Sequence, residues 1–501
     1  MAEAKARESG ARLPRAGRRL AGLLLAGTML AAMPALAQQA PPVTPFAFPA
    51  PTTGNGDPFA DTQGAGDGAS ADAASTSSPP ARPVLTDEAA AALADADDGY
   101  GPAERRVERQ NTREGSVDGA RSRFGDPYEP TGIRVGTFIL RPSISQNLGY
   151  EKTKTGATAT SRTYSQTGFR GSLTSDWSRH QLTIDAEGIY QRNISGTGET
   201  RPQARVTGDL RLDLSDDTIA HITGGYAFER ENSTDPNAVS GASVQSGVQT
   251  LTGGARVTRD FGLIRGTIGA DAERRTYGSA TLSDGSKLDL SDRNYTEGTL
   301  TGRIGYELSP ALIPYLEASV GRAVYDDKLD SSGYQRSFST LGGRAGVEID
   351  LGEKLRGDLG AGYKRATFDD SRLAALEGLT VDGSIQWSPH RGTDLRLGLR
   401  TDLEPSATAG ESGYVSYGAT AELTHELRDN LVARLSAAYT LRDFPAAGAA
   451  NQNIYLAGAG LTWNINRWLA MTGDVSYELT RQKGAANTGV TRAGIGLVLR
   501  R

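Results

Sequence analysis

The chain of 501 residues contains no cysteine. This absence excludes disulfide bonds, thiolate metal sites and cysteine nucleophiles, so packing and hydrogen bonds must hold the fold together. Histidine is also scarce. His180, His221, His390 and His425 are scattered along the chain, and none stands in a His-Glu-x-x-His pattern. No residue pattern argues for a Ser/His/Asp triad either. We therefore expect neither an enzyme nor a metal or cofactor site.

Long hydrophobic runs are also missing. Hydrophobic residues make up 37% of the chain. Beyond residue 37, no stretch approaches the roughly 18 uninterrupted apolar residues that a membrane-spanning helix needs. The 62 glycines would weaken the strands of a large soluble protein. A transmembrane β-barrel tolerates both features, because its outer face borders lipid, its interior is polar and its closure pairs the backbone groups.

The N-terminus has the features of an export signal. Residues 1–19 carry a net positive charge, an apolar run follows at residues 20–33, and the small-residue site Ala35-Leu36-Ala37 comes next. We interpret residues 1–37 as a secretory signal peptide that is cut between Ala37 and Gln38. A retained membrane anchor is the alternative. It is disfavoured because the run is too short to cross hydrocarbon comfortably.

Residues 38–130 are rich in Ala, Pro, Gly, Ser, Thr and Asp. Such a composition cannot bury enough apolar surface to offset the entropy of ordering, so it predicts a disordered segment in the periplasm. Residues 38–129 have a net charge of −8, residues 1–37 carry +4 and the whole chain −5, which leaves −1 for the remainder. The chain lacks the basic face that nucleic acid requires, so we expect no nucleic-acid partner.

Residues 202–214 show the pattern that recurs in the rest of the chain. From Ala204 onward, apolar residues and Gly alternate with charged residues and Thr. A period of two places Val206 and Leu210 on one face of a strand and Arg205 and Asp209 on the other. One face therefore requires an apolar environment and the other requires water.

The same period recurs about eighteen times between residue 131 and the end of the chain. Tight links, such as residues 178–180 and 215–217, alternate with links of roughly eight to seventeen residues, such as 231–246 and 278–293. Outer-membrane barrels sort their loops in this way, with tight periplasmic turns and long outward loops, whereas a soluble sandwich has no reason to do so. We predict an all-β fold, a transmembrane antiparallel up-and-down β-barrel of about 18 strands (16–18) over residues 131–501.

The four tryptophans support this interpretation. Trp177, Trp387, Trp463 and Trp468 all lie within a few residues of an expected tight turn. Tryptophan is enriched where a barrel crosses the membrane–water interface, so we expect an aromatic girdle on the periplasmic side. An alternative is that these residues mark the edges of a soluble sandwich.

The segment from Tyr128 to Pro142 reads YEPTGIRVGTFILRP. It resembles the opening segment of a family of outer-membrane β-barrel porins of Gram-negative bacteria, and the strand pattern over residues 125–501 agrees with that family. The resemblance implies a barrel in the cell outer membrane, with the barrel assembly machinery as a partner. Many such barrels end on an aromatic residue that this machinery reads, whereas this chain ends Leu499-Arg500-Arg501. The resemblance brings no catalytic residue and no known substrate.

Charged residues on the polar phase of the expected strands should face the lumen, where they can pair across strands or produce a transverse field that selects solutes. The predicted channel-lining residues are Arg205, Asp209, Arg211, Asp213, Arg256, Asp260, Arg265, Asp271, Glu273, Arg303, Glu317, Arg344, Glu348, Asp358, Arg396 and Arg400.

Basic residues also occur on the apolar phase, near the outward ends of seven strands. At an interface their long side chains can snorkel, so we predict a basic belt that binds lipopolysaccharide phosphates. Solvated loop residues are the alternative. The predicted belt residues are Lys152, Arg192, Arg230, Arg274, Arg322, Arg365 and Arg481.

The leading functional hypothesis is a porin-like passive channel for small solutes, because about eighteen strands enclose a lumen wide enough for water. The alternative is a non-conducting barrel that serves as a surface-polysaccharide export or assembly component. In that case the acidic segment of residues 38–130 would recruit a periplasmic partner, whereas in a simple channel it would be a spacer. The sequence names neither the solute nor the polymer.

Overall fold

The computed structural model describes residue 128 and residues 130–352, 354–408, 410–445 and 449–501. The predicted signal peptide, its cleavage site at Ala37 and Gln38, and nearly all of the predicted disordered segment lie outside these residues. Among the described residues, no helix has the length and hydropathy to cross a membrane.

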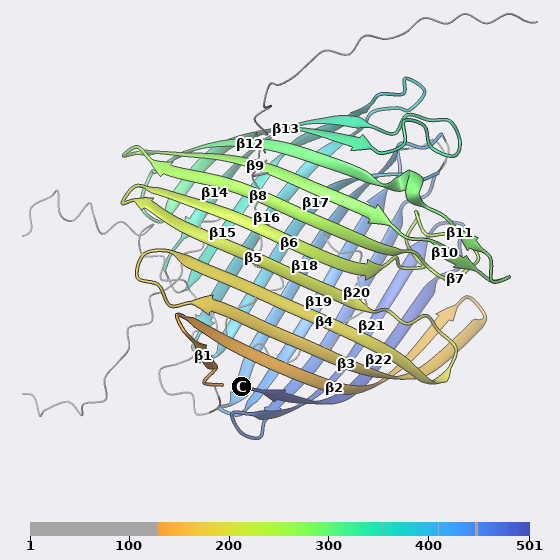
Figure 1. Cartoon of the computed structure of the whole chain (residues 1–501), viewed down its shortest axis with the longest axis horizontal. Coiled ribbons are helices and arrows are strands. Elements are labelled where there is room, and N and C mark those ends of the chain that lie inside the picture. The colour runs from red at the N-terminus through yellow and green to blue at the C-terminus, as the bar shows by residue number, and fades with distance from the viewer. Residues whose placement is uncertain (1–127, 129, 353, 409, 446–448) are drawn as a thin grey trace, which may run out of the picture. The chain divides into compact units, whose positions relative to one another are not determined.

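Almost all of the described chain is antiparallel β-structure (Figure 1). The main sheet has 19 strands, of which the short β1 (Ile133–Val135) lies outside the wall and the other 18 form a barrel. The barrel strands are β2 (Phe138–Thr155), β3 (Thr158–Ser175), β4 (Gln181–Gly196), β5 (Gln203–Ser215), β6 (Thr218–Arg230), β8 (Gly247–Asp260), β9 (Ile264–Tyr277), β12 (Tyr295–Tyr306), β13 (Leu312–Tyr325), β14 (Phe338–Asp350), β15 (Leu355–Phe368), β16 (Leu376–His390), β17 (Thr393–Pro405), β18 (Gly413–Arg428), β19 (Leu431–Asp443), β20 (Gln452–Asn464), β21 (Leu469–Gln482) and β22 (Thr488–Arg500). The predicted fold class and strand number are confirmed.

The barrel closes between its first and last strands. β2 pairs with β22 from Ser143 opposite Arg500 to Thr155 opposite Thr488, so the first and last strands leave no free edge where they meet. β1 pairs with the part of β2 that extends beyond β22. The basic C-terminus is built into this end, because Arg500 Nη2 donates to the carbonyl of Tyr128 at 3.1 Å and to Asn464 Oδ1 at 2.9 Å.

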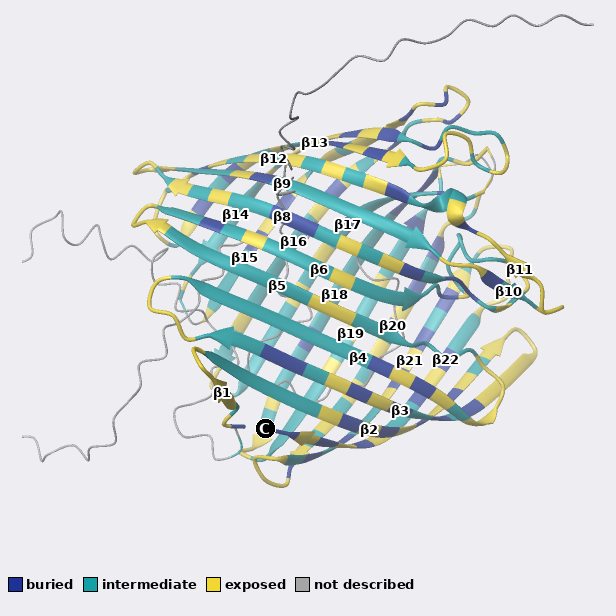
Figure 2. Ribbon diagram, viewed as in Figure 1, coloured by how far each residue is buried: buried dark blue, intermediate teal, exposed yellow. Residues whose placement is uncertain are grey.

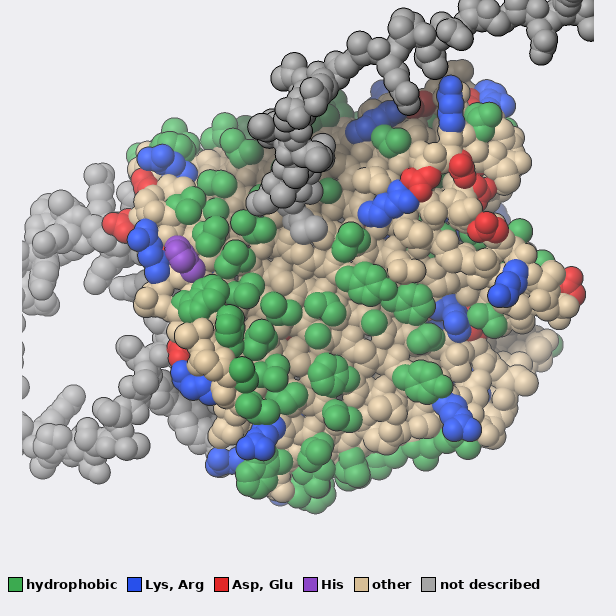
Figure 3. Space-filling model, viewed as in Figure 1, with side chains coloured by type: hydrophobic (Ala, Val, Ile, Leu, Met, Phe, Trp, Pro, Cys, Tyr) green, Lys and Arg blue, Asp and Glu red, His purple; other side chains and the backbone are tan. Residues whose placement is uncertain are grey.

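Side chains alternate between the two faces of each strand, and this alternation gives the barrel wall two different surfaces. On β13, Leu316 is 68% exposed whereas the neighbouring Glu317 faces the other side. Burial therefore alternates in bands along the strands (Figure 2). The exposed phase is largely apolar, and hydrophobic side chains cover the middle of the visible face while charged side chains gather toward its two ends (Figure 3). We call this exposed phase outward and the opposite phase inward.

The tryptophans lie where they were predicted. Trp177 lies in the turn between β3 and β4, Trp387 and Trp463 lie near the ends of β16 and β20, and Trp468 lies in the turn before β21. All four are between 39% and 53% exposed. We call this end of the barrel the short-turn end, and the other the long-loop end.

The predicted alternation of short and long links is wrong between β2 and β3, and the link between β21 and β22, residues 483–487, is also shorter than predicted. β2 and β3 are each 18 residues long, and only Gly156 and Ala157 join them at the long-loop end. Gly156 has a φ of +59°, which favours glycine, and its N–H donates to the carbonyl of Asn487. The longest links contain structure of their own, namely β7 (Ala242–Val244), β10 (Ala280–Leu282), β11 (Lys287–Leu288) and the 3-10 turn η2 (Ser291–Arg293).

Candidate functional site: the lumen wall and the loops across its mouth

The strand register places every predicted channel-lining residue on the inward phase. Arg303 of β12 lies directly opposite Glu317 of β13, and Glu317 lies directly opposite Arg344 of β14. Arg303 Nη2 is 2.8 Å from Glu317 Oε2, and Arg344 Nε is 2.7 Å from Glu317 Oε1. One carboxylate is therefore held between two guanidinium groups from neighbouring strands.

The same network continues along the wall. Arg303 Nη1 is 3.0 Å from Asp358 Oδ2, and Tyr315 donates to Asp358 Oδ1 at 2.9 Å. The guanidinium of Arg303 lies 3.8 Å from the centre of the Tyr315 ring. Arg265 pairs with both Asp260 and Glu348 at 2.9 Å. These mutual pairs brace the strands and leave little uncompensated charge on this side of the lumen.

A shallow hollow lies over this network. Its lining includes Arg256, Thr258, Thr267 and Thr301, together with Arg303. Hydroxyl groups and guanidinium groups thus face the same space. The hollow offers hydrogen-bond donors to a polar solute without a single dominant charge.

The parts of the wall on either side of this network carry further pairs. Asp209, 45% exposed at its side chain, lies 3.1 Å from Nδ1 of His221. Arg400 pairs with Asp402 at 2.7 Å, and Arg396 approaches Glu422 at 3.9 Å. Of the remaining predicted lining residues, Arg211 pairs with Asp213, Glu273 pairs with Arg275, and Arg205 and Asp271 face inward on β5 and β9.

The link between β6 and β8, residues 231–246, crosses the mouth of the barrel; we call it the crossing loop. Asn237 Nδ2 donates to the carbonyl of Pro405 at 3.1 Å, and the N–H of Ala407 donates to Asn237 Oδ1 at 2.8 Å. Arg442 of β19 pairs with Asp235 at 3.1 Å. Six barrel strands separate β8 from β17 in one direction around the ring, and seven separate β6 from β19 in the other. The loop therefore spans the ring and narrows its mouth.

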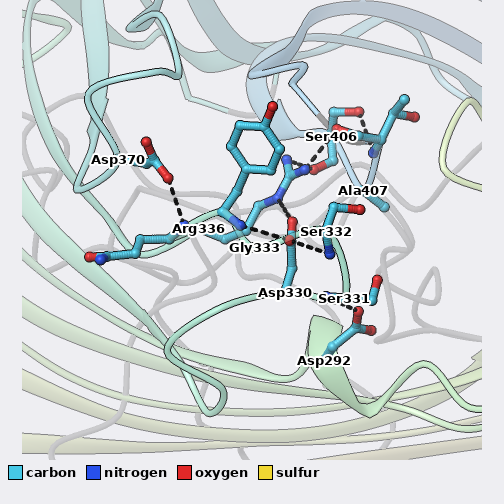
Figure 4. Close-up of polar contacts among 12 residues, drawn as sticks. Asp292, Asp330, Ser331, Ser332, Gly333, Arg336, Asp370, Ser406 and Ala407 are labelled. Atoms are coloured by element: carbon cyan, nitrogen blue, oxygen red, sulfur yellow. Dashed lines mark hydrogen bonds and ion pairs between the residues drawn. The ribbon is translucent and has the colours of Figure 1, made fainter.

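A second set of contacts joins the neighbouring loops (Figure 4). Arg336, which is 4% exposed, pairs with Asp330 in its own loop at 2.7 Å. Its other nitrogens donate to the carbonyls of Ser406, Thr408 and Glu411 in the link between β17 and β18. One guanidinium thus fixes two loops to each other.

Burial shifts the pKa of one carboxyl group in the crossing loop. Burial raises the pKa of Glu231 to about 7, and Asp235 and Glu199 add to the rise. Arg293, 3.7 Å away, and Arg275 oppose it. This carboxyl group therefore titrates close to neutral pH, at the base of the loop that narrows the mouth.

Sequence reasoning missed the residues that fix these loops. It gave the bounds of the crossing loop correctly, but it gave no role to Asn237, Arg336 or Arg442. Polar loop residues show no periodicity, and their partners are separated by as many as 208 positions along the chain. No sequence signal could have paired Asn237 with Ala407.

The predicted basic belt is only partly available to a ligand. Outward-facing carboxylates hold three of its members, in the pairs Arg274–Asp326, Arg322–Asp369 and Arg365–Glu377. Hydrogen bonds from Arg274 and Arg322 lower the pKa of Asp326 and of Asp369, respectively. Arg230 donates to the carbonyl of Thr200, whereas Lys152, Arg192 and Arg481 are exposed on the outward phase.

Comparison with known proteins agrees with the predicted fold. Residues 126–501 match the profile of the family described as "Putative beta-barrel porin 2". This match covers most of the chain and confirms the resemblance seen in the opening segment. It does not favour the alternative of a non-conducting export or assembly barrel. No curated protein matches the chain.

Solved outer-membrane proteins are remote in sequence. The opdK protein of Pseudomonas aeruginosa is 10% identical, covers 72% of this chain and 99% of its own, and superimposes with a TM-score of 0.36. OccAB4 of Acinetobacter baumannii is 11% identical, covers 75% of this chain and 100% of its own, and gives a TM-score of 0.37. At these values the likeness carries no argument about the solute.

Proposed function

Because the chain belongs to the Putative beta-barrel porin 2 family, we propose that it is a passive porin-like channel that admits small polar solutes through the outer membrane. The observation that carries the proposal is the closed ring of strands with a charged and polar inward face. A closed barrel of this strand number leaves a lumen that side chains alone do not fill. The crossing loop limits the size of the solute that enters.

Selection should depend on dipole and size more than on net charge. The inward charges are mostly paired, as in the Arg303–Glu317–Arg344 row, and the chain from residue 130 onward is close to neutral. Paired rows of opposite sign orient a polar solute without attracting ions of one sign. We therefore propose weak ion selectivity.

Swelling of proteoliposomes in neutral sugars of increasing size tests this function. A passive channel of this kind admits monosaccharides rapidly and slows sharply as the sugar grows, because the crossing loop sets a limit. Liposomes that contain heat-denatured protein are the control. Swelling that stays at the control rate for every sugar would contradict the proposal.

In this proposal the long loops face outward and residues 38–130 lie in the periplasm as a spacer. The alternative role of that segment, recruitment of a periplasmic partner, is tested by deletion of residues 38–120. Unchanged surface polymer and unchanged pore activity in the deleted variant would dispose of recruitment.

The outward basic residues supply a further proposed contact. Lys152, Arg192 and Arg481 are exposed on the outward phase, and they can bind phosphates of lipopolysaccharide. The three arginines with carboxylate partners would contribute less, because their charge is already compensated. The other proposed partners are outer-membrane lipid and the barrel assembly machinery.

A further inference from the structure

The barrel wall is interrupted between β16 and β17. Their ladder runs from His390 opposite Thr393 up to Gly383 opposite Leu399, and no pair follows above it. On either side the wall stays intact, since β15 pairs with β16 as far as Leu376 and β17 pairs with β18 as far as Pro405. The interruption thus belongs to one seam and not to a frayed end.

Thr401 stands where the ladder stops. Its Oγ1 accepts from the N–H of Val381 at 2.9 Å and donates to the carbonyl of the same residue at 3.1 Å. Its own N–H donates to Asp382 Oδ1 at 2.8 Å. The side chains of Thr401 and Asp382 thus take up backbone N–H and C=O groups that would otherwise pair between the two strands. The strands are therefore held farther apart than in a ladder.

Above Thr401 the two edges of the wall overlap. On the outward phase of β17, Leu399 is 38% exposed but Thr401 is only 7% exposed, and outward-phase Val415 of β18 is 3% exposed. On the inward phase of β16, Leu376 is 1% exposed and Thr380 is 6% exposed. The inner face of β16 therefore covers the outer face of β17 and β18.

Contacts at Gly378 agree with this arrangement. A Cβ atom built on Gly378 of β16 would lie 3.1 Å from the hydroxyl of Tyr417 and 3.4 Å from a Cγ of Val415, both on β18. β17 lies between these strands in the order of the sheet. Side chains of β18 can therefore contact β16 only if β16 lies over the outer face of β17. We call the residues between the two layers, 376–381 with 401–404 and 415–417, the overlap.

The overlap is apolar and continuous with the mouth of the lumen. A single buried cluster contains inward-phase Phe368 and Leu376 together with outward-phase Val415, and Leu403 and Tyr417 pack against it. Side chains from opposite faces of a sheet can join one cluster only where the ladder between them is missing. The cluster extends through the wall to Tyr295 and Phe338 at the mouth.

The interruption between β16 and β17 begins near the outer edge of the apolar surface of the barrel. Outward-phase Leu379 and Val381 of β16 are 69% and 40% exposed, as expected for side chains against hydrocarbon. The Arg365–Glu377 pair lies at the next position toward the long-loop end. A molecule in the outer half of the membrane would meet the edge of β16 just below this charged pair.

We propose that the overlap is a lateral passage, by which a single-chain amphiphile moves between the membrane and the mouth of the lumen. From the membrane, the path of the amphiphile bends around the edge of β16 and runs between the two layers. It reaches the lumen around the edge of β17. The apolar chain lies among Phe368, Leu376 and Val415. The polar head reaches the lumen beside Thr401 and Asp402. No backbone ladder joins the layers, so they part by loss of side-chain packing and of the three hydrogen bonds that Thr401 makes with Val381 and Asp382.

Photolabelling of the native chain tests the passage without any substitution. The chain, in outer-membrane vesicles, is illuminated with a diazirine derivative of laurate, and the labelled residues are mapped by mass spectrometry. We expect label on partly buried Leu403 and buried Val415 as well as on exposed side chains such as Leu379. Label confined to exposed outward residues on every strand would overturn the proposal.

A disulfide tests whether the layers must part, and the absence of native cysteine makes the result unambiguous. Gly378→Cys with Val415→Cys should lock the overlap when oxidised, so that label at residues 401–417 is lost and returns on reduction. The control is Ala345→Cys with Ala361→Cys, directly opposite each other in the intact ladder of β14 and β15. Equal labelling in the oxidised and reduced states of the first variant would also overturn the proposal.

Potassium chloride conductance separates this proposal from that of the channel. The locked variant should conduct as well as the native chain, because the lumen lies inside both layers. Conductance without label on the residues of the overlap would contradict the lateral passage but not the channel. Buried label without conductance contradicts the passive channel and leaves the passage standing.

Discussion

Asn237 and Ala407 are joined across the mouth of the barrel, with the N–H of Ala407 donating to Asn237 Oδ1 at 2.8 Å. The side-chain amide of Asn237 also donates to the carbonyl of Pro405. One side chain thus holds the tip of the crossing loop against the opposite wall. Each such bond contributes about 0.5 to 1.5 kcal/mol to docking.

Asn237→Ala removes both contacts, so the crossing loop should leave the opposite wall more often. We expect a larger mean single-channel conductance and more frequent steps between levels. Ser243→Ala is the matched control, because Ser243 lies in the same loop and its hydroxyl bonds to the carbonyls of residues 281 and 282, on its own side. Identical traces for the native chain and Asn237→Ala would show that the loop does not narrow the path.

Glu231 makes docking of the loop depend on pH. Its folded pKa of about 7 exceeds the ordinary value of 4.5, so the docked loop binds the proton more tightly than the free loop. Docking is therefore strongest below about pH 4.5 and weakens as the pH rises through about 7. Steps between conductance levels should become more frequent over that range.

Glu231→Gln should abolish this pH dependence, because the amide cannot ionise. Asp284→Asn is the control, since Asp284 is an exposed loop carboxylate outside the crossing loop. A pH dependence that survives in Glu231→Gln would assign the titration to another group.

Glu317→Gln should change both stability and selectivity. The carboxylate lies between Arg303 and Arg344 with its side chain 10% exposed, and breaking such a buried pair costs up to about 3 to 5 kcal/mol. The lumen also gains positive charge, so the reversal potential in a potassium chloride gradient should shift toward anions. Glu187→Gln is the control for stability, because the Arg170–Glu187 pair is more exposed and contributes about 0 to 1 kcal/mol. An unchanged reversal potential in Glu317→Gln would remove this row from the conducting path.

The exposed basic residues should matter only where lipid phosphates are present. Lys152→Gln, Arg192→Gln and Arg481→Gln together should lower the melting temperature in membranes with lipopolysaccharide and leave it nearly unchanged in neutral detergent. The paired set, Arg274→Gln, Arg322→Gln and Arg365→Gln, should lower it in both settings, because each change leaves a carboxylate without its partner. An equal loss for the exposed set in both settings would mean that these side chains support the fold itself.

The alternation of Leu316 and Glu317 shows why the sequence predicted the wall so well. A two-residue period fixes which face of a strand each side chain occupies, and that suffices for the strand number and the inward phase of the charges. The pattern does not encode what covers a face. The two-residue period puts Val415 and Tyr417 on the apolar phase, yet β16 buries Val415 to 3% exposure, because the wall overlaps there.

Loop contacts were beyond prediction for a different reason. Arg336 reaches three carbonyl groups in another loop, and carbonyl groups leave no trace in the sequence. The tight link between β2 and β3 was missed, although Gly156 adopts a positive φ, because a single glycine among many does not mark a turn.

Single-channel recording in planar bilayers tests the central claim most directly. The purified chain should insert with discrete steps of conductance that show little preference between potassium and chloride, since the lumen is continuous and its charges are mostly paired. A bilayer that stays sealed at all voltages, although folded barrel is present in it, would contradict the account.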